Sequence, residues 1–285
     1  MLKNKSIAFL GAGSMAEAMI AGIVNAGKVP TDQIFVTNNS NEKRLEELTI
    51  KYGINGVKRE NLHFNQIDIF ILAMKPKDAD RALNSIKSLL TPNQLVLSVL
   101  AGISTSFMEQ NLQAGQQVIR VMPNTSSMIG ESATALSPGA HTTQTNLSIA
   151  KELLESIGEV FIINEEKMDI FTGLAGSGPA YFYYLMEHME KAGLKGGLDV
   201  ETTRKIIAQT IVGAARMIQE QDEDPTVLRE NVTSPNGTTA AGLDALRKNG
   251  GGKAIAEAVF HAANRSKEIS SKLAETIDSK KLKAI

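Results

Sequence analysis

The sequence predicts an α/β protein in two parts, an N-terminal doubly wound, mostly parallel sheet and a C-terminal all-helical region. Three observations support this prediction. Short apolar runs alternate with helical patterns up to residue 163, the strand pattern then disappears, and the rest of the chain carries only helical periodicity. With 285 residues, 42% of them hydrophobic, the chain can bury two cores. We therefore expect domains over residues 1–163 and 164–285.

Composition narrows the classes of partner. The formal charge of -1, from 30 Lys and Arg against 31 Asp and Glu, offers no bulk attraction for nucleic acid or an anionic membrane. The absence of cysteine excludes thiolate ligands, and four scattered histidines predict no metal site. The first apolar run is too short for a signal peptide, and no stretch reaches the roughly 20 apolar residues of a membrane span. We expect a cytoplasmic protein with a small-molecule partner.

A glycine-rich turn follows the first predicted strand, residues 6–10. Residues 11–16, GAGSMA, fit the pattern G-x-G-x-x-[GA], and a helical pattern then continues to Val24. The two glycines allow a tight turn and close backbone approach, and Ala16 allows close packing of the helix on the strand. Backbone N–H groups at the helix start would then face a pyrophosphate. This context predicts a Rossmann-type dinucleotide-binding domain.

The end of the second predicted strand, residues 33–37, indicates which dinucleotide is bound. A site for NAD usually has Asp or Glu about 20 residues past the glycines, where the carboxylate accepts from the ribose hydroxyl. Here residues 37–40 read TNNS, and Arg44 follows one turn later. Neutral donors and a cation suit a 2′-phosphate, so we expect NADPH, with NADH as a weaker alternative. Asn39 and Ser40 are equally compatible with helix capping.

Further strands are predicted at residues 67–74, 95–99 and 117–122, with a helix over 78–90. Closing strands at 131–136 and 158–163 flank a helix over 145–156. In an open parallel sheet, ligands bind beyond the carboxyl ends of the strands, where the loops after these strands meet. Lys75 is therefore a candidate for the cofactor edge, although an ordinary solvated lysine is equally compatible with the sequence.

The C-terminal region carries helical patterns at residues 165–194, 202–220 and 253–273. The sequence GSGP at 176–179 predicts a kink or break, because proline removes a backbone N–H and glycine relaxes the chain. The region is rich in Ala and Gly and has a small core for its length. We expect it to bury its apolar faces against a second copy, as a homodimer that could assemble further.

One polar stretch, NVTSPNGTTAAG at residues 231–242, contains no ionisable side chain. A short helix opening at Asp224 and Pro225 should end near Asn231. A turn over 233–237 should follow, and Thr238 and Thr239 should then start a helix over 240–248. Hydroxyls, amides and N–H groups at a helix start can hold a small polar ligand. A capped surface loop is the alternative.

These motifs resemble the pyrroline-5-carboxylate reductase family. The stretch NVTSPNGTT resembles the family signature N-V-[ST]-S-P-G-G-[TS]-T, and the resemblance extends over residues 6–268. The other matching motifs are GAGSMAEA at 11–18, AMKP at 73–76, RVMPNT at 120–125 and GLAGSGPAYFY at 173–183. One departure is Asn236, where the family has glycine. Asparagine tolerates a left-handed backbone, so the turn should survive.

The resemblance implies a reaction and a set of residues. NADPH would deliver hydride to the ring C=N carbon of 1-pyrroline-5-carboxylate, giving L-proline, the last step of proline biosynthesis. The catalytic donor to the imine nitrogen would be the hydroxyl of Thr239. The implied substrate-binding residues are Ser234, the backbone N–H groups of Gly237, Thr238 and Thr239, and Glu165, with Glu166 as the alternative to Glu165. The implied cofactor residues are Leu10, Gly11, Ala12, Gly13, Ser14 and Met15 at the phosphates, Asn38 and Ser40 at the 2′-phosphate, Asn61 at the adenosine, Ala73, Met74, Lys75, Pro76, Val99, Leu100 and Ala101 at the nicotinamide, and Asn231 from the helical domain.

Two other classes stay open. An NADP-dependent hydroxyacid dehydrogenase would share the fingerprint and the helical domain, but it needs an acid or base for an alcohol, for which Lys191 and Lys195 are the candidates. A non-enzymatic NADP-binding protein would keep the cofactor loops but has no reason to keep TSPNGTT.

Overall fold

A computed structural model describes residues 2–282 of the chain, with side chains over residues 2–272. The chain forms two compact units, one comprising the chain up to Ser177 together with the segment from His261 onward, the other Gly178–Phe260. No helix in the described part of the chain combines the length and apolar character needed to cross a membrane.

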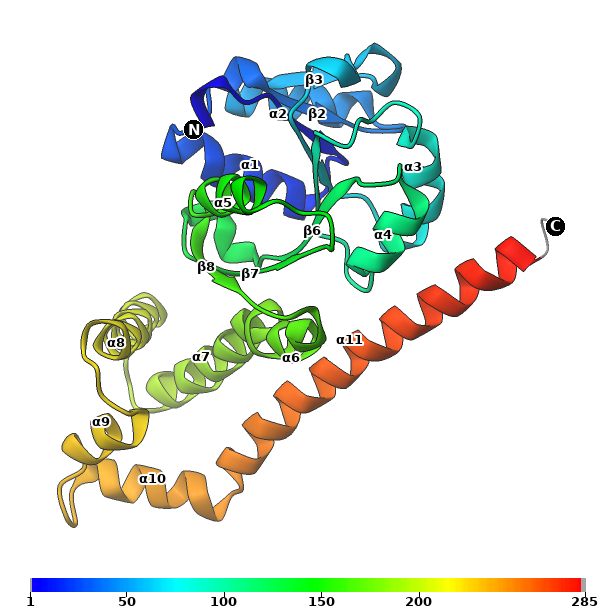
Figure 1. The fold of residues 1–285 in the computed structure, drawn as a ribbon. Helices are drawn as coiled ribbons and strands as arrows, with labels where there is room; N and C mark the ends of the chain where they lie inside the picture. The colour runs from blue at the N-terminus through cyan, green and yellow to red at the C-terminus, as the bar shows by residue number, and fades with distance from the viewer. Residues whose placement is uncertain (1, 283–285) are drawn as a thin grey trace. The chain divides into compact units, whose positions relative to one another are not determined.

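The first unit contains an eight-stranded sheet with the order β3-β2-β1-β4-β5-β6-β7-β8 (Figure 1). Neighbouring strands are parallel except β6 and β7, which are antiparallel. All predicted strands are present, and the prediction of a doubly wound sheet is confirmed. The strand β3 was not predicted, because its three residues NGV carry no apolar alternation. The strands are β1 (Ile7–Leu10), β2 (Ile34–Thr37), β3 (Asn55–Val57), β4 (Ile69–Leu72), β5 (Leu95–Ser98), β6 (Gln117–Met122), β7 (Ser132–Pro138) and β8 (Gly158–Ile162).

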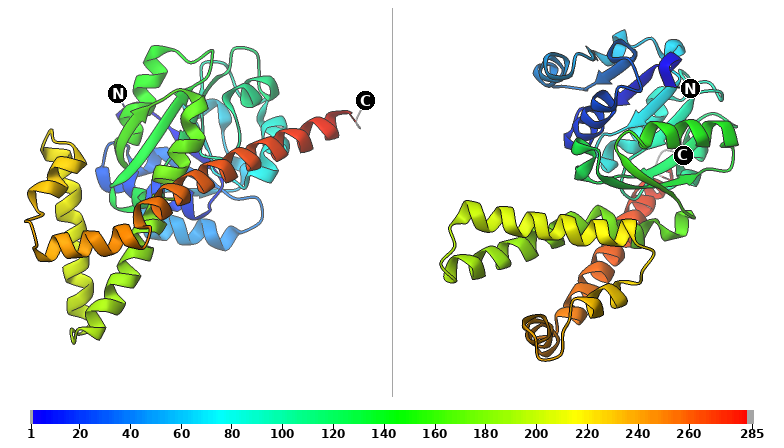
Figure 2. Two further views of the ribbon diagram at one scale, coloured as in Figure 1. Left: turned by 90° about the horizontal axis from the view of Figure 1, so that it is seen from below. Right: turned by 90° about the vertical axis from the view of Figure 1, so that its left-hand side faces the viewer.

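Helices cover both faces of the sheet (Figures 1 and 2). Because successive strand residues face opposite sides, Ile7 and Phe9 of β1 pack with one set of helices, while Ala8 and Leu10 pack with the other. Burial on both faces explains why the strands read as continuous apolar runs. The first set is α1 (Ser14–Ala26), α2 (Glu42–Tyr52) and α5 (Gln144–Leu154); the second is α3 (Ala79–Ile86), which ends earlier than predicted, and the unpredicted α4 (Thr105–Asn111).

The chain after β8 passes through α6 (Met168–Phe171) and a π-helical turn, Thr172–Gly176, before α7 (Gly178–Lys195). The predicted break at residues 176–179 is confirmed. Pro179 lies in the first turn of α7. The N–H groups of a first turn have no acceptor within the helix, so the lack of an N–H on proline removes no helical hydrogen bond there.

The predicted boundary after residue 163 follows the last strand, whereas compactness places residues 164–177 and the later part of α11 (Gly251–Leu282) with the sheet. Packing explains the difference, because Met168 is buried against Met122 and Ala135. Ser266 Oγ of α11 also donates to Asp169 Oδ1 at 2.7 Å. The division at residue 163 stays a prediction about functional domains.

The second unit is all helical. It contains α7, α8 (Val200–Glu220), α9 (Pro225–Asn231), α10 (Thr238–Lys248) and the beginning of α11. Side-chain caps start two of the helices, since Asp199 accepts from the Thr202 N–H and Asp224 from the Thr226 N–H. Asn236, in the turn before α10, has a φ of 59° and is the one non-glycine residue with positive φ in the described chain. The expectation that asparagine would take this left-handed backbone is confirmed.

Candidate functional site: a dinucleotide cleft and a polar helix start

The loops after β1, β2 and β4 meet at the carboxyl ends of these neighbouring strands. Leu10 of β1 lies between Thr37 of β2 and Leu72 of β4 in the strand register. The next residues therefore emerge together: the Gly11 N–H donates to Thr37 O at 3.0 Å, and the Ala73 N–H donates to Leu10 O at 3.0 Å. Here the strand order reverses direction, which is the position where open α/β sheets bind ligands.

Glycine at position 11 is required by this convergence. Its φ is 126°, and a Cβ built there would lie 2.5 Å from Ala73 O. Gly13, by contrast, is the N-cap of α1 without a side-chain cap, and a Cβ built on it would meet nothing within 4 Å. The first N–H groups of a helix have no intrahelical acceptor. The loop thus leaves open space beside unpaired donors, which fits a pyrophosphate.

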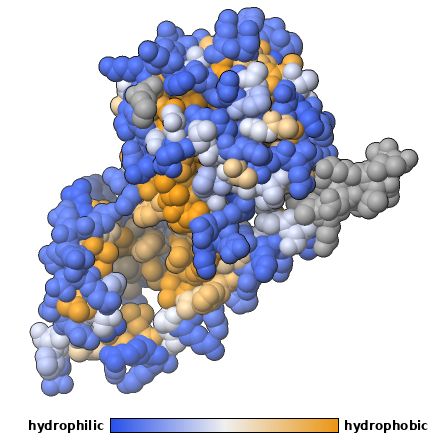
Figure 3. All heavy atoms as spheres, in the orientation of Figure 1, coloured by the Kyte–Doolittle hydropathy of each residue, from blue (hydrophilic) through white to orange (hydrophobic). Residues whose placement is uncertain are grey.

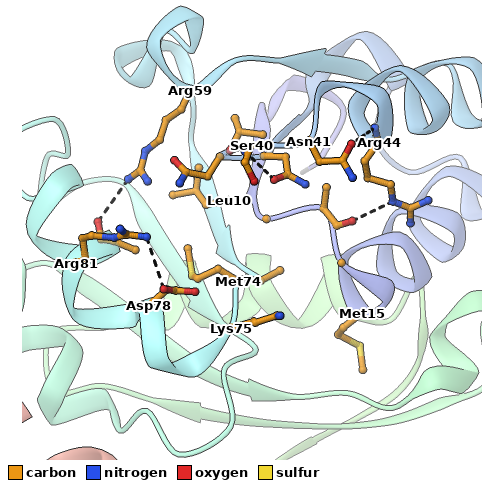
Figure 4. Close-up of a pocket in the computed structure, with 18 of the residues that line it drawn as sticks. Leu10, Met15, Ser40, Asn41, Arg44, Arg59, Met74, Lys75, Asp78 and Arg81 are labelled. Carbon is orange, nitrogen blue, oxygen red and sulfur yellow. Dashed lines mark hydrogen bonds and ion pairs between the residues drawn. The ribbon is translucent and has the colours of Figure 1, made fainter. Parts of the chain in front are cut away.

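A cleft of about 1330 Å³ runs along this edge (Figure 4). The structure brings together along it all the predicted residues of the phosphate loop, 10–15, those of the segment 73–76, and both Asn38 and Ser40. Their contact with a cofactor stays a prediction. Thr37, Asn39 and Arg44, which the sequence placed near a 2′-phosphate, also line it. The remaining lining residues were not expected from the sequence: Asn41, Arg59, Lys77, Asp78, Arg81, Ala82 and Ser85.

Three other predicted residues, Val99, Leu100 and Ala101, form the loop after β5 and do not line this cleft. The Val99 N–H donates to Leu72 O of the neighbouring strand at 3.1 Å. The loop is backed by α11, since Gly102 has a φ of 79° and a Cβ on it would lie 3.0 Å from Ser270 Cα. The backbone of α11 at Ser270 therefore lies close to the end of this loop.

Asn61 is exposed and also lies outside the cleft. It ends a 3-10 turn, Arg59–Asn61, whose first residue does line the cleft. No motif of the family resemblance covers this turn. The side chain that reaches the cleft is that of Arg59, two positions before Asn61.

The start of α2 differs from the capping expectation for Asn39 and Ser40. The helix begins at Glu42, and its N-cap is Asn41, whose Oδ1 accepts from the Arg44 N–H at 3.0 Å. Asn38 Oδ1 instead accepts from the Ser40 N–H at 3.3 Å. Asn39 and Ser40 are therefore not caps of α2, because the helix starts later than expected.

Arg44 braces the phosphate loop against α2. Its Nε donates to Ala12 O at 3.1 Å, and its terminal nitrogens pair with the carboxylates of Glu17 and, at 3.4 Å, Glu47. Glu17 also accepts from Lys51 Nζ at 2.9 Å. The hydrogen bond from Arg44, followed by that from Lys51, lowers the pKa of Glu17 to about 2. The charge of Arg44 is thus balanced by two carboxylates.

A predicted pH dependence follows from the lowered pKa of Glu17. A carboxyl with a depressed pKa stabilises the fold above its ordinary value of 4.5, and this contribution is lost as the pH falls toward 2. We expect Glu17→Gln to lower the free energy of unfolding by up to about 3 kcal/mol at pH 7. The difference from the native protein should shrink between about pH 5 and pH 2.

Urea unfolding of both proteins at pH 7, 4 and 3 measures this difference. The exposed Glu47 gives a matched control, because Glu47→Gln removes a longer, more solvated contact and should cost less than about 1 kcal/mol. A Glu17→Gln effect that does not change with pH would contradict the assignment.

Glu165 lines a separate hollow of about 590 Å³, together with Glu166 and Arg120. Its carboxylate accepts from the Thr105 N–H at 2.9 Å, from Thr105 Oγ1 at 2.5 Å and from Arg120 Nη1 at 3.2 Å. Glu165 therefore ties the start of α4 to the buried Arg120 of β6. Glu166 is exposed. The substrate-side role of either residue stays a prediction.

The polar stretch at 231–242 lies in the second unit. Gly237 is the N-cap of α10. Its N–H donates to Ser234 O at 3.0 Å, so this group is already paired, contrary to the expectation that it would bind a ligand. The N–H groups of Thr238 and Thr239 fall in the first turn, where no intrahelical acceptor exists. Both threonine side chains are exposed, as are Ser234 and Asn231. The stretch thus presents an open helix start with a hydroxyl beside it.

The groups that the hydroxyacid alternative would use lie on solvated helix faces. Lys191 Nζ donates to Glu187 Oε1 at 2.6 Å, one turn away, and this contact raises the pKa of Lys191. Lys195 is exposed at the end of α7. In the described chain, no cluster of three or more His, Asp or Glu side chains could hold a metal ion.

Comparisons with known proteins assign both parts of the chain. Residues 165–269 match the family model described as pyrroline-5-carboxylate reductase dimerisation, and residues 6–102 match the model described as NADP oxidoreductase, coenzyme F420-dependent. The first match lies in the region expected to form a dimer. The second contains the glycine loop and all three strands whose loops converge on the cleft, β1, β2 and β4.

Relatives and solved structures agree with these matches. The chain is 59% identical over 273 residues to pyrroline-5-carboxylate reductase 1 of Bacillus subtilis, covering 96% of this chain and 92% of the relative. The Arabidopsis thaliana enzyme is 35% identical, covering 93% and 95%. The Plasmodium falciparum pyrroline carboxylate reductase with NADP bound has a TM-score of 0.86 at 30% identity, covering 95% of this chain and 100% of that one. The Coxiella burnetii enzyme has a TM-score of 0.84 at 30% identity, covering 94% and 99%. As its motifs indicate, this chain belongs to the pyrroline-5-carboxylate reductase family.

Proposed function

We propose that this chain reduces 1-pyrroline-5-carboxylate to L-proline with NADPH. The observation that carries the proposal is the uncharged helix start at Thr238 and Thr239, present in the same chain as a cleft that fits a dinucleotide. Family membership supplies the reaction class, an NADP-dependent reduction of a C=N bond.

The proposed chemistry needs a hydrogen-bond donor and an anion site but no protein nucleophile. When bound, the reduced nicotinamide supplies a hydride to the ring carbon of the imine. The N–H groups of Thr238 and Thr239, at the positive end of the α10 dipole, hold the substrate carboxylate. The Thr239 hydroxyl donates a hydrogen bond to the imine nitrogen, which makes the adjacent carbon more electrophilic. Water supplies the proton that this nitrogen gains when the hydride adds to the carbon. Rate enhancement then comes from orientation and electrostatics.

The preference for NADPH over NADH is supported by the end of β2. No Asp or Glu follows Thr37 there, so no carboxylate is placed to accept from a ribose 2′-hydroxyl or to repel a 2′-phosphate. Asn38, Asn39 and Ser40 line the cleft with neutral donors instead. Cationic side chains complete this end of the cleft.

A homodimer through the helical region is supported by the faces that its helices expose. Large apolar side chains of α7 and α8 are 43–63% exposed, and Figure 3 shows apolar side chains gathered on the visible face of the helical region. A monomer rarely leaves contiguous apolar surface of this kind in water. The matching family model is described as a dimerisation model, which supports a second copy of the chain as the partner. The residues concerned are Phe182, Tyr183, Tyr184, Leu185 and Met189 of α7 and Ile206, Val212, Met217 and Ile218 of α8.

NADPH oxidation with 1-pyrroline-5-carboxylate tests the proposed reaction directly. We expect rapid loss of nicotinamide absorbance with the imine and formation of L-proline, with slower turnover when NADH replaces NADPH. A 2-hydroxyacid with NADP, assayed in the reverse direction, should give no turnover. Binding of NADPH without imine reduction would favour the non-enzymatic alternative.

The role of the Thr239 hydroxyl can be tested with a pair of variants. Thr239→Ala should lower kcat by about a hundredfold, the usual effect of removing one preorganised donor. Thr239→Ser keeps the hydroxyl and should stay within a few fold of the native kcat. Thr145→Ala, on the exposed surface of α5 and outside the proposed dimer face, is the matched control and should leave kcat unchanged. Equal losses in the two Thr239 variants would place the donor elsewhere.

Light scattering coupled to size-exclusion chromatography tests the assembly. We expect a mass of twice that of one chain, or an even multiple of it, because the exposed apolar faces of α7 and α8 require a partner. A monomer that persists at micromolar concentration would contradict the proposed homodimer.

A further inference from the structure

We propose that Arg59, rather than Arg44, is the cation that recognises the 2′-phosphate of NADPH in this chain. The inference rests on the NADPH preference proposed above and concerns the residue that produces it. Arg59 was not singled out by the sequence, because it lies neither in a family motif nor after the strand that usually decides the cofactor.

The cleft carries an excess of positive charge. Five cationic side chains line it, against one acidic side chain, Asp78. The cations are Arg44, Arg59, Lys75, Lys77 and Arg81. A phosphate group is the ligand whose charge complements this wall, and its oxygens match the N–H groups of a guanidinium. The cation best suited to bind it is one whose charge is not already paired with a carboxylate of the protein.

Arg44, the cation expected from the sequence, is already neutralised. Two carboxylates, Glu17 and Glu47, contact its terminal nitrogens, and its Nε donates to Ala12 O. A dianion approaching Arg44 would also approach Glu17, which stays ionised down to about pH 2 because of its low pKa. The attraction of Arg44 for a phosphate is therefore largely cancelled.

The strand register brings Arg59 to the same end of the cleft from the other side. Thr37 of β2 pairs with Val57 of β3, so the residues two positions beyond them, Asn39 and Arg59, both leave the sheet at this edge. Figure 4 shows Arg59 on one side of Ser40 and Arg44 on the opposite side.

Arg59 is held in place without a counter-ion. Its Nη2 donates to Ser85 Oγ at 2.7 Å and to Ala82 O at 3.4 Å, and both acceptors are neutral. No carboxylate in the described chain forms an ion pair with it, and no described group accepts from its Nε or Nη1. Burial, and then the charge of Arg81, lowers the pKa of Arg59, which is the effect expected of a half-buried cation lacking an anion. A bound phosphate would offset both the burial of the Arg59 charge and its repulsion by Arg81.

The other cations are less suited to this role. Arg81 lies 3.6 Å from Asp78 and its side chain is 78% exposed, so water and a carboxylate screen it. Lys77 is exposed. Lys58, next to Arg59 in sequence, does not line the cleft and pairs with Glu42 at 2.6 Å. Lys58 is therefore a matched control for removal of one positive charge near β3.

The test compares adenosine 2′,5′-bisphosphate with adenosine 5′-monophosphate, which differ only in the 2′-phosphate, by calorimetric titration of the full chain. The native protein should bind the bisphosphate more tightly. In Arg59→Gln, which keeps a donor for Ser85 but removes the charge, the affinity for the bisphosphate should fall about tenfold or more, while that for the monophosphate changes less than about twofold. Arg59→Lys should retain part of the preference, and Lys58→Gln all of it.

The folded state of the variants is checked first. Thermal unfolding of Arg59→Gln confirms that the variant is folded, and Arg59→Lys supplies the same comparison if it is not. A native preference for the bisphosphate that survives in the Arg59 variants, or that is lost instead in Arg44→Gln, would overturn the role of Arg59 alone. A native protein that binds both nucleotides equally would overturn the NADPH preference as well. Imine reduction does not enter the measurement, so failure of the proposed reaction is seen separately.

Discussion

The close backbone approach of Gly11 to Ala73 is the contact on which the cofactor half of the structure depends. With a Cβ at position 11 placed 2.5 Å from Ala73 O, any other residue would push the first and fourth strand ends apart. That approach sets where α1 begins, and hence where its unpaired N–H groups point. It also brings residues 73–76 into the same cleft as the phosphate loop. Glycine at position 11 thus allows the ends of β1 and β4 to lie close enough for their loops to line one cleft.

The charge that this cleft offers to an anionic ligand depends on how its cations pair within the protein. Arg44 and Arg59 both line the cleft, and from the sequence Arg44 is the obvious cation, since it follows β2 by one helical turn. In the structure Arg44 mainly serves to hold α2 against the loop at Ala12, because Glu17 and Glu47 balance its charge. Arg59 faces only neutral acceptors. What matters for an anionic ligand is the charge left after internal pairing.

Much of the fold could be predicted from the sequence, because buried strands and amphipathic helices have periodic patterns. The elements that were missed are short: β3 is three residues of NGV, and α4 is a single seven-residue helix after a loop. At the site, motif residues such as Gly11 and Lys75 were found because their spacing carries the information. Arg59 was not, since its proximity to Ser40 arises from pairing of β2 with β3, and the occupied Gly237 N–H depends on the local turn geometry.

The two candidate binding regions, one in each compact unit, use opposite physical means to hold anions. The cofactor cleft offers formal charge, through half-buried Arg59 and its neighbours, and in the proposed role of Arg59 this charge would distinguish ligands by how many phosphates they carry. The helix start at Thr238 supplies only backbone dipoles and hydroxyls, since residues 231–242 contain no ionisable side chain. Such a site has no titrating group of its own near neutral pH. In the proposed reaction, no carboxylate or lysine within residues 231–242 would compete with the bound imine for its proton, and the Thr239 hydroxyl would be the side-chain donor to its nitrogen.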